Sequence, residues 1–246
     1  MRLAVVSDIH GNLPALEAVM AHCKRHGVDQ VINLGDCLSG PLLPLETAQF
    51  LMAQDWVHLA GNHDHQILAY GTPACTDVDE VAYEQLGASE LAWLKTLPAV
   101  KLIWRSGILL CHGTPANDLE YFLETVESTG ARMASCQEVE ARLGATQAKL
   151  ILCGHTHKPR AVRVTSGQLV VNPGSVGLPA FDDAIPYPHV IQTGSPDAHY
   201  ALLERVHNEW SVALVSVPYD YRPMAKLAQS RHFYDWAHAL ETGYVS

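Results

Sequence analysis

Short apolar runs alternate with segments of helical periodicity in the first part of the chain. Residues 3–7, 30–34 and 56–59 are typical of buried strands, because each is a short and mostly apolar run. The apolar positions between the first two runs recur at helical spacing, with Asn12 as a candidate N-cap and Gly27 as a stop. A second helix is expected near 45–54. This βαβαβ order predicts a largely parallel sheet covered by helices.

The rest of the chain changes to a pattern richer in short strands. We expect helices over three segments, at 89–97, 119–127 and 136–143. We expect strands over three more, at 100–104, 108–111 and 149–153. Alternating runs beyond them predict hairpins from a second sheet, at 161–165, 168–171, 200–206 and 210–217. No repeat or linker interrupts this order, so residues 1–246 are predicted to form one domain.

Two segments near the C-terminus leave alternatives open. Residues 177–197 are rich in Gly, Pro and Asp and have no clear periodicity. Such a segment is typical either of a lid or substrate-facing loop, here through Tyr187 or His189, or of a disordered surface loop. The apolar side chains of Phe233, Trp236 and Leu240 predict either a packed terminal helix or a surface for homo-oligomerisation.

Composition and charge exclude several classes of protein. The chain is 48% hydrophobic and 17% charged, which is ordinary for a globular protein. No apolar run approaches the roughly 20 residues of a membrane-spanning helix, and the apolar start is too short for a signal peptide, so we expect a cytoplasmic protein without a membrane partner. The net charge of −10 disfavours a nucleic-acid groove. It does not exclude a phosphorylated small molecule, because bound dications can reverse the local sign of charge.

The six cysteines show no C-x-x-C spacing, so free thiols fit better than a disulfide framework. Cys37, Cys111 and Cys153 each lie within two residues of a candidate metal ligand. They are interpreted as small buried hydrophobes, with thiolate ligation as the alternative.

Carboxylates, imidazoles and one amide follow the predicted strands, each at the point where an apolar run ends. The candidate ligands are Asp8, His10, Asp36, Asn62, His112, His155 and His157. Because ligands of open α/β sheets collect beyond the carboxyl ends of the strands, these side chains should meet at one rim. The i, i+2 spacing of the first pair and of the last pair lets both side chains of a pair point the same way from an extended segment. This nitrogen and oxygen set is expected for two adjacent divalent metals, which predicts a dinuclear metal hydrolase.

The ordered motifs resemble those of the calcineurin-like metallophosphoesterase superfamily, especially its small single-domain bacterial phosphodiesterases. The similarity covers Asp-x-His, Gly-Asp, Gly-Asn-His-Asp, His-Gly and Gly-His-Thr-His, and extends over residues 1–177 with the later segment 172–175. It implies an α/β fold in which two mixed sheets and flanking helices form a four-layer αββα sandwich. It also implies that two metals lie about 3.5–4 Å apart and share a hydroxide, which attacks phosphorus in line.

The resemblance further implies a role for each candidate residue. Asp8, His10 and His157 would bind one metal, Asn62, His112 and His155 the other, and Asp36 both.

Three further residues are assigned to catalysis or to substrate. By the same analogy His63 is the general acid for the leaving alkoxide, Asp64 orients its ring, and Asn62 and His63 contact the substrate. The alternative is that His63 only supports Asn62. Arg160 is a candidate phosphate contact, with an exposed strand-end arginine as the plainer interpretation.

The segment after Asp36 narrows the substrate class. It lacks the arginine that clamps phosphate in protein Ser/Thr phosphatases, so that activity is an alternative rather than the expectation. We expect hydrolysis of a phosphodiester or phosphomonoester of a small molecule, such as a nucleotide or a dinucleoside polyphosphate. Specificity would reside in rim loops around 117–121 and 177–197. A different alternative is a non-catalytic interaction module on the same fold, as in a retromer subunit that resembles this superfamily.

Metal identity stays open at this level. Nitrogen and oxygen ligands admit Mn²⁺, which we expect first, and also Fe, Zn²⁺, Ni²⁺ or Co²⁺.

Overall fold

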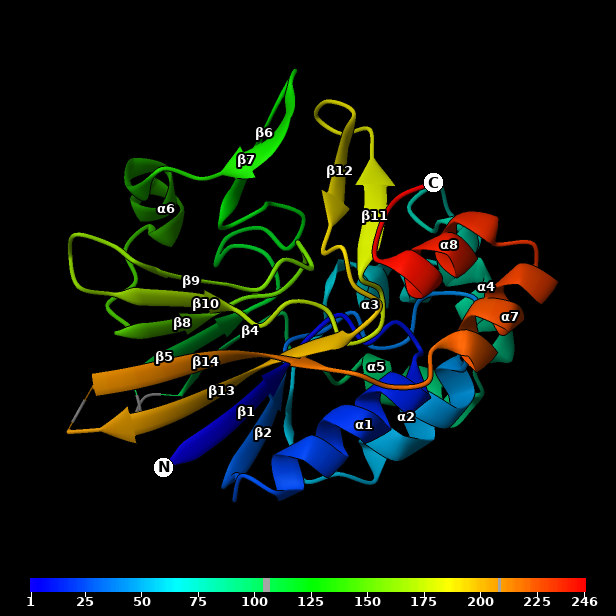
Figure 1. The fold of residues 1–246 in the computed structure, drawn as a ribbon, viewed down its shortest axis with the longest axis horizontal. Helices are drawn as coiled ribbons and strands as arrows, with labels where there is room; N and C mark the ends of the chain where they lie inside the picture. The colour runs from blue at the N-terminus through cyan, green and yellow to red at the C-terminus, as the bar shows by residue number, and fades with distance from the viewer. Residues whose placement is uncertain (104–106, 208) are drawn as a thin grey trace.

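The computed structural model describes residues 1–103, 107–207 and 209–246, and its centre is a pair of five-stranded sheets that face each other (Figure 1). The first sheet has the strand order β14 (Glu209–Val217), β13 (Ala198–Val206), β1 (Arg2–Val6), β2 (Gln30–Asn33), β3 (Val57–His58). Within it β1, β2 and β3 run parallel, and β13 is antiparallel to both of its neighbours.

The second sheet is also mixed. Its order is β4 (Val100–Ile103), β5 (Ile108–Cys111), β8 (Leu150–Leu152), β10 (Leu169–Asn172), β9 (Arg160–Arg163). The three central strands are parallel, and the two edge strands are antiparallel to them. Trp104, the last residue of the strand predicted at 100–104, lies outside the described residues.

Alternation along the strands divides the core into layers. On β1, Leu3 and Val5 pack toward the other sheet, whereas Ala4 and Val6 pack against helices on the outer face. This is the period of two that a strand imposes on its side chains. Each fully buried Leu or Val contributes about 1.5–3 kcal/mol, so both faces of the first sheet must be covered.

Helices cover the outer face of each sheet. Five helices contribute apolar side chains to the cover of the first sheet, α1 (Leu13–Lys24), α2 (Pro44–Met52), α3 (Asn62–Leu68), α4 (Asp77–Gln85) and α5 (Ala88–Leu94). On the second sheet, Val139 and Leu143 of α6 (Cys136–Leu143) pack on β5, β8 and β10. The layers are therefore helix, sheet, sheet, helix, which confirms the predicted four-layer αββα sandwich.

Two small hairpins and a helical pair stand outside these layers (Figure 1). The hairpins are β6 (Glu124–Glu127) with β7 (Gly130–Met133), and β11 (Ala180–Asp183) with β12 (His189–Gln192). The helical pair is α7 (Arg222–Ser230) and α8 (Tyr234–Thr242), which confirms the predicted packed terminal helix. In the described part of the chain, no helix has the length and apolar character needed to cross a bilayer.

Most predicted elements occur within a few residues of their expected bounds, and Asn12 caps α1 by accepting a hydrogen bond from Ala15 N at 3.3 Å. The helix predicted at 119–127 is wrong, because Val126 pairs with Ala131 across a hairpin that turns near Gly130, where φ is +117°. The alternative that 177–197 is a disordered surface loop is also wrong, since β11 and β12 pair there. Its role as a lid, and the single domain, stay predictions.

Candidate metal centre

Strand ends from both sheets deliver the candidate ligands to one place. Asp8, Asp36 and Asn62 follow β1, β2 and β3 of the first sheet, and His112 and His155 follow β5 and β8 of the second. The facing sheets therefore meet at an edge that carries carboxylates on one side and imidazoles on the other. Sequence reasoning predicted this convergence from the direction of parallel strands alone.

The ligand atoms gather in two clusters. Asp8, His10 and His157 form one, Asp36, His112 and His155 the other, and the ligand atoms within each lie within 4.8 Å of one another. Between the clusters, His112 Nε2 lies 3.8 Å from Asp8 Oδ1 and 3.1 Å from Asp36 Oδ2. The structure thus brings these six side chains together in two sets of three, and the assignment of each residue to a metal stays a prediction.

Hydrogen bonds behind the imidazoles fix which ring nitrogen is offered to a metal. Nδ1 of His112 donates to Leu34 O at 2.9 Å, and Nδ1 of His157 donates to Leu178 O at 2.7 Å. Nδ1 of His10 lies 2.8 Å from Ser39 Oγ. In His112 and His157 these backbone acceptors leave Nε2 facing the cluster, which is the ring orientation that metal-binding histidines need.

Two buried atoms test whether the site fits a metal. Asn62 Oδ1 and His112 Nε2 are buried and have no hydrogen-bond partner among the described residues. His112 Nε2 is close to Asp36 Oδ2, but the geometry is not that of a hydrogen bond. Buried polar atoms nearly always have hydrogen-bond partners, so Asn62 Oδ1 without one, beside His112 Nε2 with only carboxylates near it, fits a site built for a cation. Oxygen and imidazole nitrogen are suitable donors for the divalent metals predicted here.

The backbone around the ligands is tightly packed. A Cβ at Gly61 would meet the carboxylate of Asp36, and a Cβ at Gly35, where φ is +104°, would meet the backbone of Gly61. Glycine is therefore required at both positions. The expected extended segments at 8–10 and 155–157 do not form, because Asp8, His10 and His157 have φ between +50° and +55°. The two side chains of each pair converge through left-handed turns instead.

The segment that follows β10 holds the two loops together. Asn172 Nδ2 donates to Gly154 O at 2.7 Å, and Ser175 Oγ donates to Asp8 O at 2.8 Å. The sequence singled out this segment only by its resemblance. Its physical role is to tie the loop after β1 to the loop after β8.

His63 has a different partner from the one predicted. Its Nδ1 lies 2.9 Å from Asp79 Oδ1 on α4, and its backbone N donates to Asp36 Oδ1 at 2.9 Å. The prediction that Asp64 orients the ring is wrong, because the two oxygens of Asp64 accept from Gly61 N and Cys37 N. At the third position of its helix, a carboxylate is drawn to free backbone N–H groups. Sequence reasoning missed Asp79 because it lies in a helix that was not predicted.

Burial and neighbouring charges give the imidazoles either lowered or raised pKa values. Burial, with the neighbouring His157, lowers the pKa of His10 to about 3, and burial, with His112, lowers the pKa of His155 to about 4. Burial alone would also lower the pKa of His112, but the charge of Asp36 raises it to about 10. His63 behaves likewise, because Asp36 and Asp79 outweigh its burial and raise its pKa to about 9.

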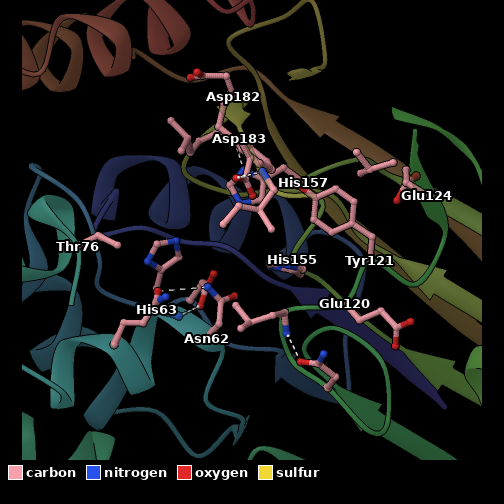
Figure 2. Close-up of a pocket in the computed structure, with 18 of the residues that line it drawn as sticks. Asn62, His63, Thr76, Glu120, Tyr121, Glu124, His155, His157, Asp182 and Asp183 are labelled. Carbon is pink, nitrogen blue, oxygen red and sulfur yellow. Dashed lines mark hydrogen bonds between the residues drawn. The ribbon is translucent and has the colours of Figure 1, made fainter. Parts of the chain in front are cut away.

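The centre opens into a cavity of about 830 Å³ (Figure 2). Both predicted rim segments reach it, through Asn117 and Tyr121 on one side and Phe181 and Asp183 on the other. Arg160 is not among the described residues that line it. Its Nε donates to the buried Glu124 Oε1 at 2.8 Å, so this structure does not support the predicted phosphate contact.

The cysteines are all free thiols. Neither ligand cluster contains one, and burial raises the pKa of Cys37, Cys111 and Cys153. They therefore stay neutral, which supports their interpretation as buried hydrophobes.

Known structures share this fold over the full chain. A metallophosphoesterase from Sphaerobacter thermophilus is 24% identical, with a TM-score of 0.76 and 99% of each chain covered. A hypothetical protein from Pyrococcus horikoshii is 21% identical, with a TM-score of 0.74 and coverage of 100% of this chain and 99% of that one. At these identities the likeness shows the fold.

Sequence comparison identifies the family. An uncharacterized protein of Methanocaldococcus jannaschii is 24% identical over 266 aligned positions, which cover 95% of this chain and 94% of that protein. Residues 1–193 match the calcineurin-like phosphoesterase superfamily domain. With that match over most of its length, the chain belongs to the calcineurin-like phosphoesterase superfamily.

Proposed function

We propose that this protein is a phosphoesterase that binds two divalent metal ions and hydrolyses a phosphodiester or phosphomonoester of a small molecule in the cytoplasm. The observation that carries the proposal is the pair of three-residue ligand clusters, beside which the buried Asn62 Oδ1 has no hydrogen-bond partner among the described residues. Manganese is the first choice, and Fe, Zn²⁺, Ni²⁺ or Co²⁺ suit the same donors. A complete ligand set argues against a scaffold that has lost its chemistry.

The candidate ligands would hold two metal ions. Asp8, His10 and His157 would hold one metal, His112, His155 and Asn62 the other, with Asp36 between them. Bound there, two dications supply Lewis-acid stabilisation of the phosphoryl oxygens and make water a stronger nucleophile. The cavity of about 830 Å³ has the size of small-molecule sites.

His63 is proposed as the proton donor to the leaving alkoxide. Its ring lines the cavity, and its Nδ1 donates a hydrogen bond to Asp79 Oδ1. Nε2 then carries the proton that can be transferred. Asp79 is fully buried and its other oxygen is held by Thr76 N at 3.2 Å, so it is a rigid positioning residue. The raised pKa of His63 keeps it protonated at neutral pH, and nearby dications would lower this pKa toward neutrality.

The proposal is tested with aryl phosphodiesters and monoesters after chelation and after reloading with Mn²⁺. Metal-dependent release of the aryl alcohol is the expected result. If the reloaded protein cleaves neither class of ester, the proposed activity is wrong.

Two variants separate metal binding from proton transfer. His155→Ala should lose metal occupancy, whereas His63→Ala should retain both metals and lose about 100-fold or more in kcat for an alkyl ester. With p-nitrophenolate, which leaves without a proton, the loss in His63→Ala should be small. Asp79→Asn should show the same dependence on the leaving group. Metal loss in His63→Ala would contradict this division.

A further inference from the structure

Carboxylates gather in the cavity beyond the candidate metal ligands. Glu120, Glu124, Asp182 and Asp183 all line it, and Arg142 is the one arginine or lysine among its described lining residues. The guanidinium of Arg142 donates to the backbone oxygens of residues 122 and 124 at 3.0 Å and to a threonine hydroxyl at 2.9 Å. This arginine therefore holds the start of β6, its Nε lies 3.9 Å from Glu120 Oε1, and carboxylates outnumber cations among the described residues that line the cavity.

One of these carboxylates has an unused oxygen. Glu124 is 2% exposed, and its Oε1 accepts from Arg160. Its Oε2 is buried and has no hydrogen-bond partner among the described residues. A buried carboxylate oxygen without a donor is costly, and a donor or cation on a bound molecule would relieve that cost.

Aromatic rings line the cavity beside the candidate metal ligands. Tyr121 packs edge-on to His155 at a centroid distance of 5.1 Å, and Phe181 packs edge-on to His157 at 4.7 Å. Trp236 of α8 packs edge-on to His10 at 5.7 Å. All three aromatic side chains line the cavity. Aromatic faces together with carboxylates are the usual surroundings of an organic ammonium group.

Tyr121 lies next to both a candidate metal ligand and one of these carboxylates. In the view of Figure 2 it lies between His155 and Glu124, while Asp182 and Asp183 lie on the opposite wall of the cavity. Tyr121 is buried, with 9% of its surface exposed. Its hydroxyl is 3.0 Å from His189 Nε2, so the ring is held in position.

We infer that the part of the cavity around Tyr121 binds an ammonium group on the organic part of the substrate. The substrate class would then be a phosphate ester of an amino alcohol. The inference rests on the proposed phosphoesterase function of the same site. The phosphate would lie at the metal centre, and the ammonium group beside Glu124, Asp183 and the aromatic rings. The same carboxylates would repel a second phosphate, which disfavours the dinucleoside polyphosphates considered from the sequence.

Binding to the metal-loaded protein tests the inference directly. Phosphocholine is compared with neohexyl phosphate, an isostere in which carbon replaces the charged nitrogen, by isothermal titration calorimetry. We expect phosphocholine to bind about tenfold more tightly, because only the cation gains from the carboxylates and aromatic faces. Equal or weaker binding of phosphocholine would overturn the inference.

Variants of the cavity test which side chains cause the preference for phosphocholine. Glu124→Gln and Asp183→Asn should each reduce the ratio of the two affinities by about threefold or more. Glu209→Gln removes the same charge from an exposed position on β14 and should leave the ratio unchanged. If Glu124→Gln does not fold, the exposed pair Asp182→Asn with Asp183→Asn gives the same test. A ratio that survives in all pocket variants would also overturn the inference.

Hydrolysis distinguishes failure of the inference from failure of the proposed function. p-Nitrophenyl phosphocholine and methyl p-nitrophenyl phosphate share a leaving group and differ in the retained alcohol. Cleavage of both without preference for the cation would refute the ammonium site and leave the phosphoesterase intact. Preferential binding of phosphocholine without cleavage of either ester would support the ammonium site and refute the enzyme.

Discussion

Five of the seven candidate ligands have backbone in the left-handed region, which residues other than glycine rarely adopt. Their φ values are +55° at Asp8, +50° at His10, +52° at Asp36, +70° at His155 and +53° at His157. Each such residue costs about 1–2 kcal/mol and persists only where its surroundings hold it. Here the hydrogen bonds from segment 172–175 and between neighbouring strand ends provide that constraint.

Because of this strain, we expect a glycine variant at these positions to be more stable than the alanine variant, the reverse of the usual order. In metal-free protein, His155→Gly should be about 1 kcal/mol more stable to urea than His155→Ala, because glycine adopts a φ of +70° without penalty. At His22 on α1 the order should be normal, with glycine the less stable by about 1 kcal/mol. Equal stability of the two variants at position 155 would show that the turn is not strained.

Metal affinity should depend on pH through His112. Its pKa of about 10 means that the metal-free protein holds a proton there at neutral pH, and metal binding must release it. Affinity should therefore rise with pH, by up to about tenfold per unit for one proton, between about pH 6 and 9. The raised pKa also means that this proton stabilises the metal-free fold at low pH and that the stabilisation is lost as pH approaches 10. Competition with a metal indicator measures the affinity, and a pH-independent value would contradict the assignment.

At the scale of elements, the cavity is built from pieces that connect or follow the sheets. Val126 on β6 and Phe181 on β11 reach the cavity from the two hairpins, and Trp236 reaches it from α8. Asp79 on α4 orients His63. The sheets thus position the ligands, while the added elements shape the space in which a substrate would bind.

The packing of α8 should matter for both stability and the site. Leu240 is fully buried in a cluster with Leu42 and α7, so Leu240→Ala should cost about 2–5 kcal/mol in the free energy of unfolding. Tyr234→Ala on the same helix, at a side chain 59% exposed, should stay within about 0.5 kcal/mol of the parent. Chemical denaturation compares the two. A small loss in Leu240→Ala would mean that α8 is not an integral part of the fold.

At the scale of the whole molecule, the metal centre lies where two sheets meet, so metal should stabilise the entire fold. Chelation should lower Tm by about 5–10 °C if the free metal exceeds its Kd about a hundredfold, and reloading should restore it. His155→Ala, which lacks one ligand, should show a smaller difference between the two states. An unchanged Tm of the parent protein after verified metal removal would argue against a structural contribution from the centre.

The sequence by itself predicted most of the strands and helices and the candidate ligands, and the family resemblance implied the four layers. Period-two and period-3.6 patterns predicted most strands and helices, and the direction of parallel strands placed Asp8, Asp36 and His112 at one rim. These features are local, since each depends on a residue's immediate neighbours and on the end of its own strand. The ligand identities followed from the motifs together with the family resemblance.

Only the tertiary structure decided what depends on distant contacts. Asp79 lies beside His63 instead of Asp64, because Asp64 accepts from Gly61 N at the start of its own helix and from Cys37 N after β2, while α4 brings Asp79 to the ring. The left-handed turns at the ligands formed because contacts across the sheets outweigh local backbone preference. The cavity combines Glu124, Asp183 and Trp236, which are separated along the chain and line one space only when both hairpins and α8 have packed.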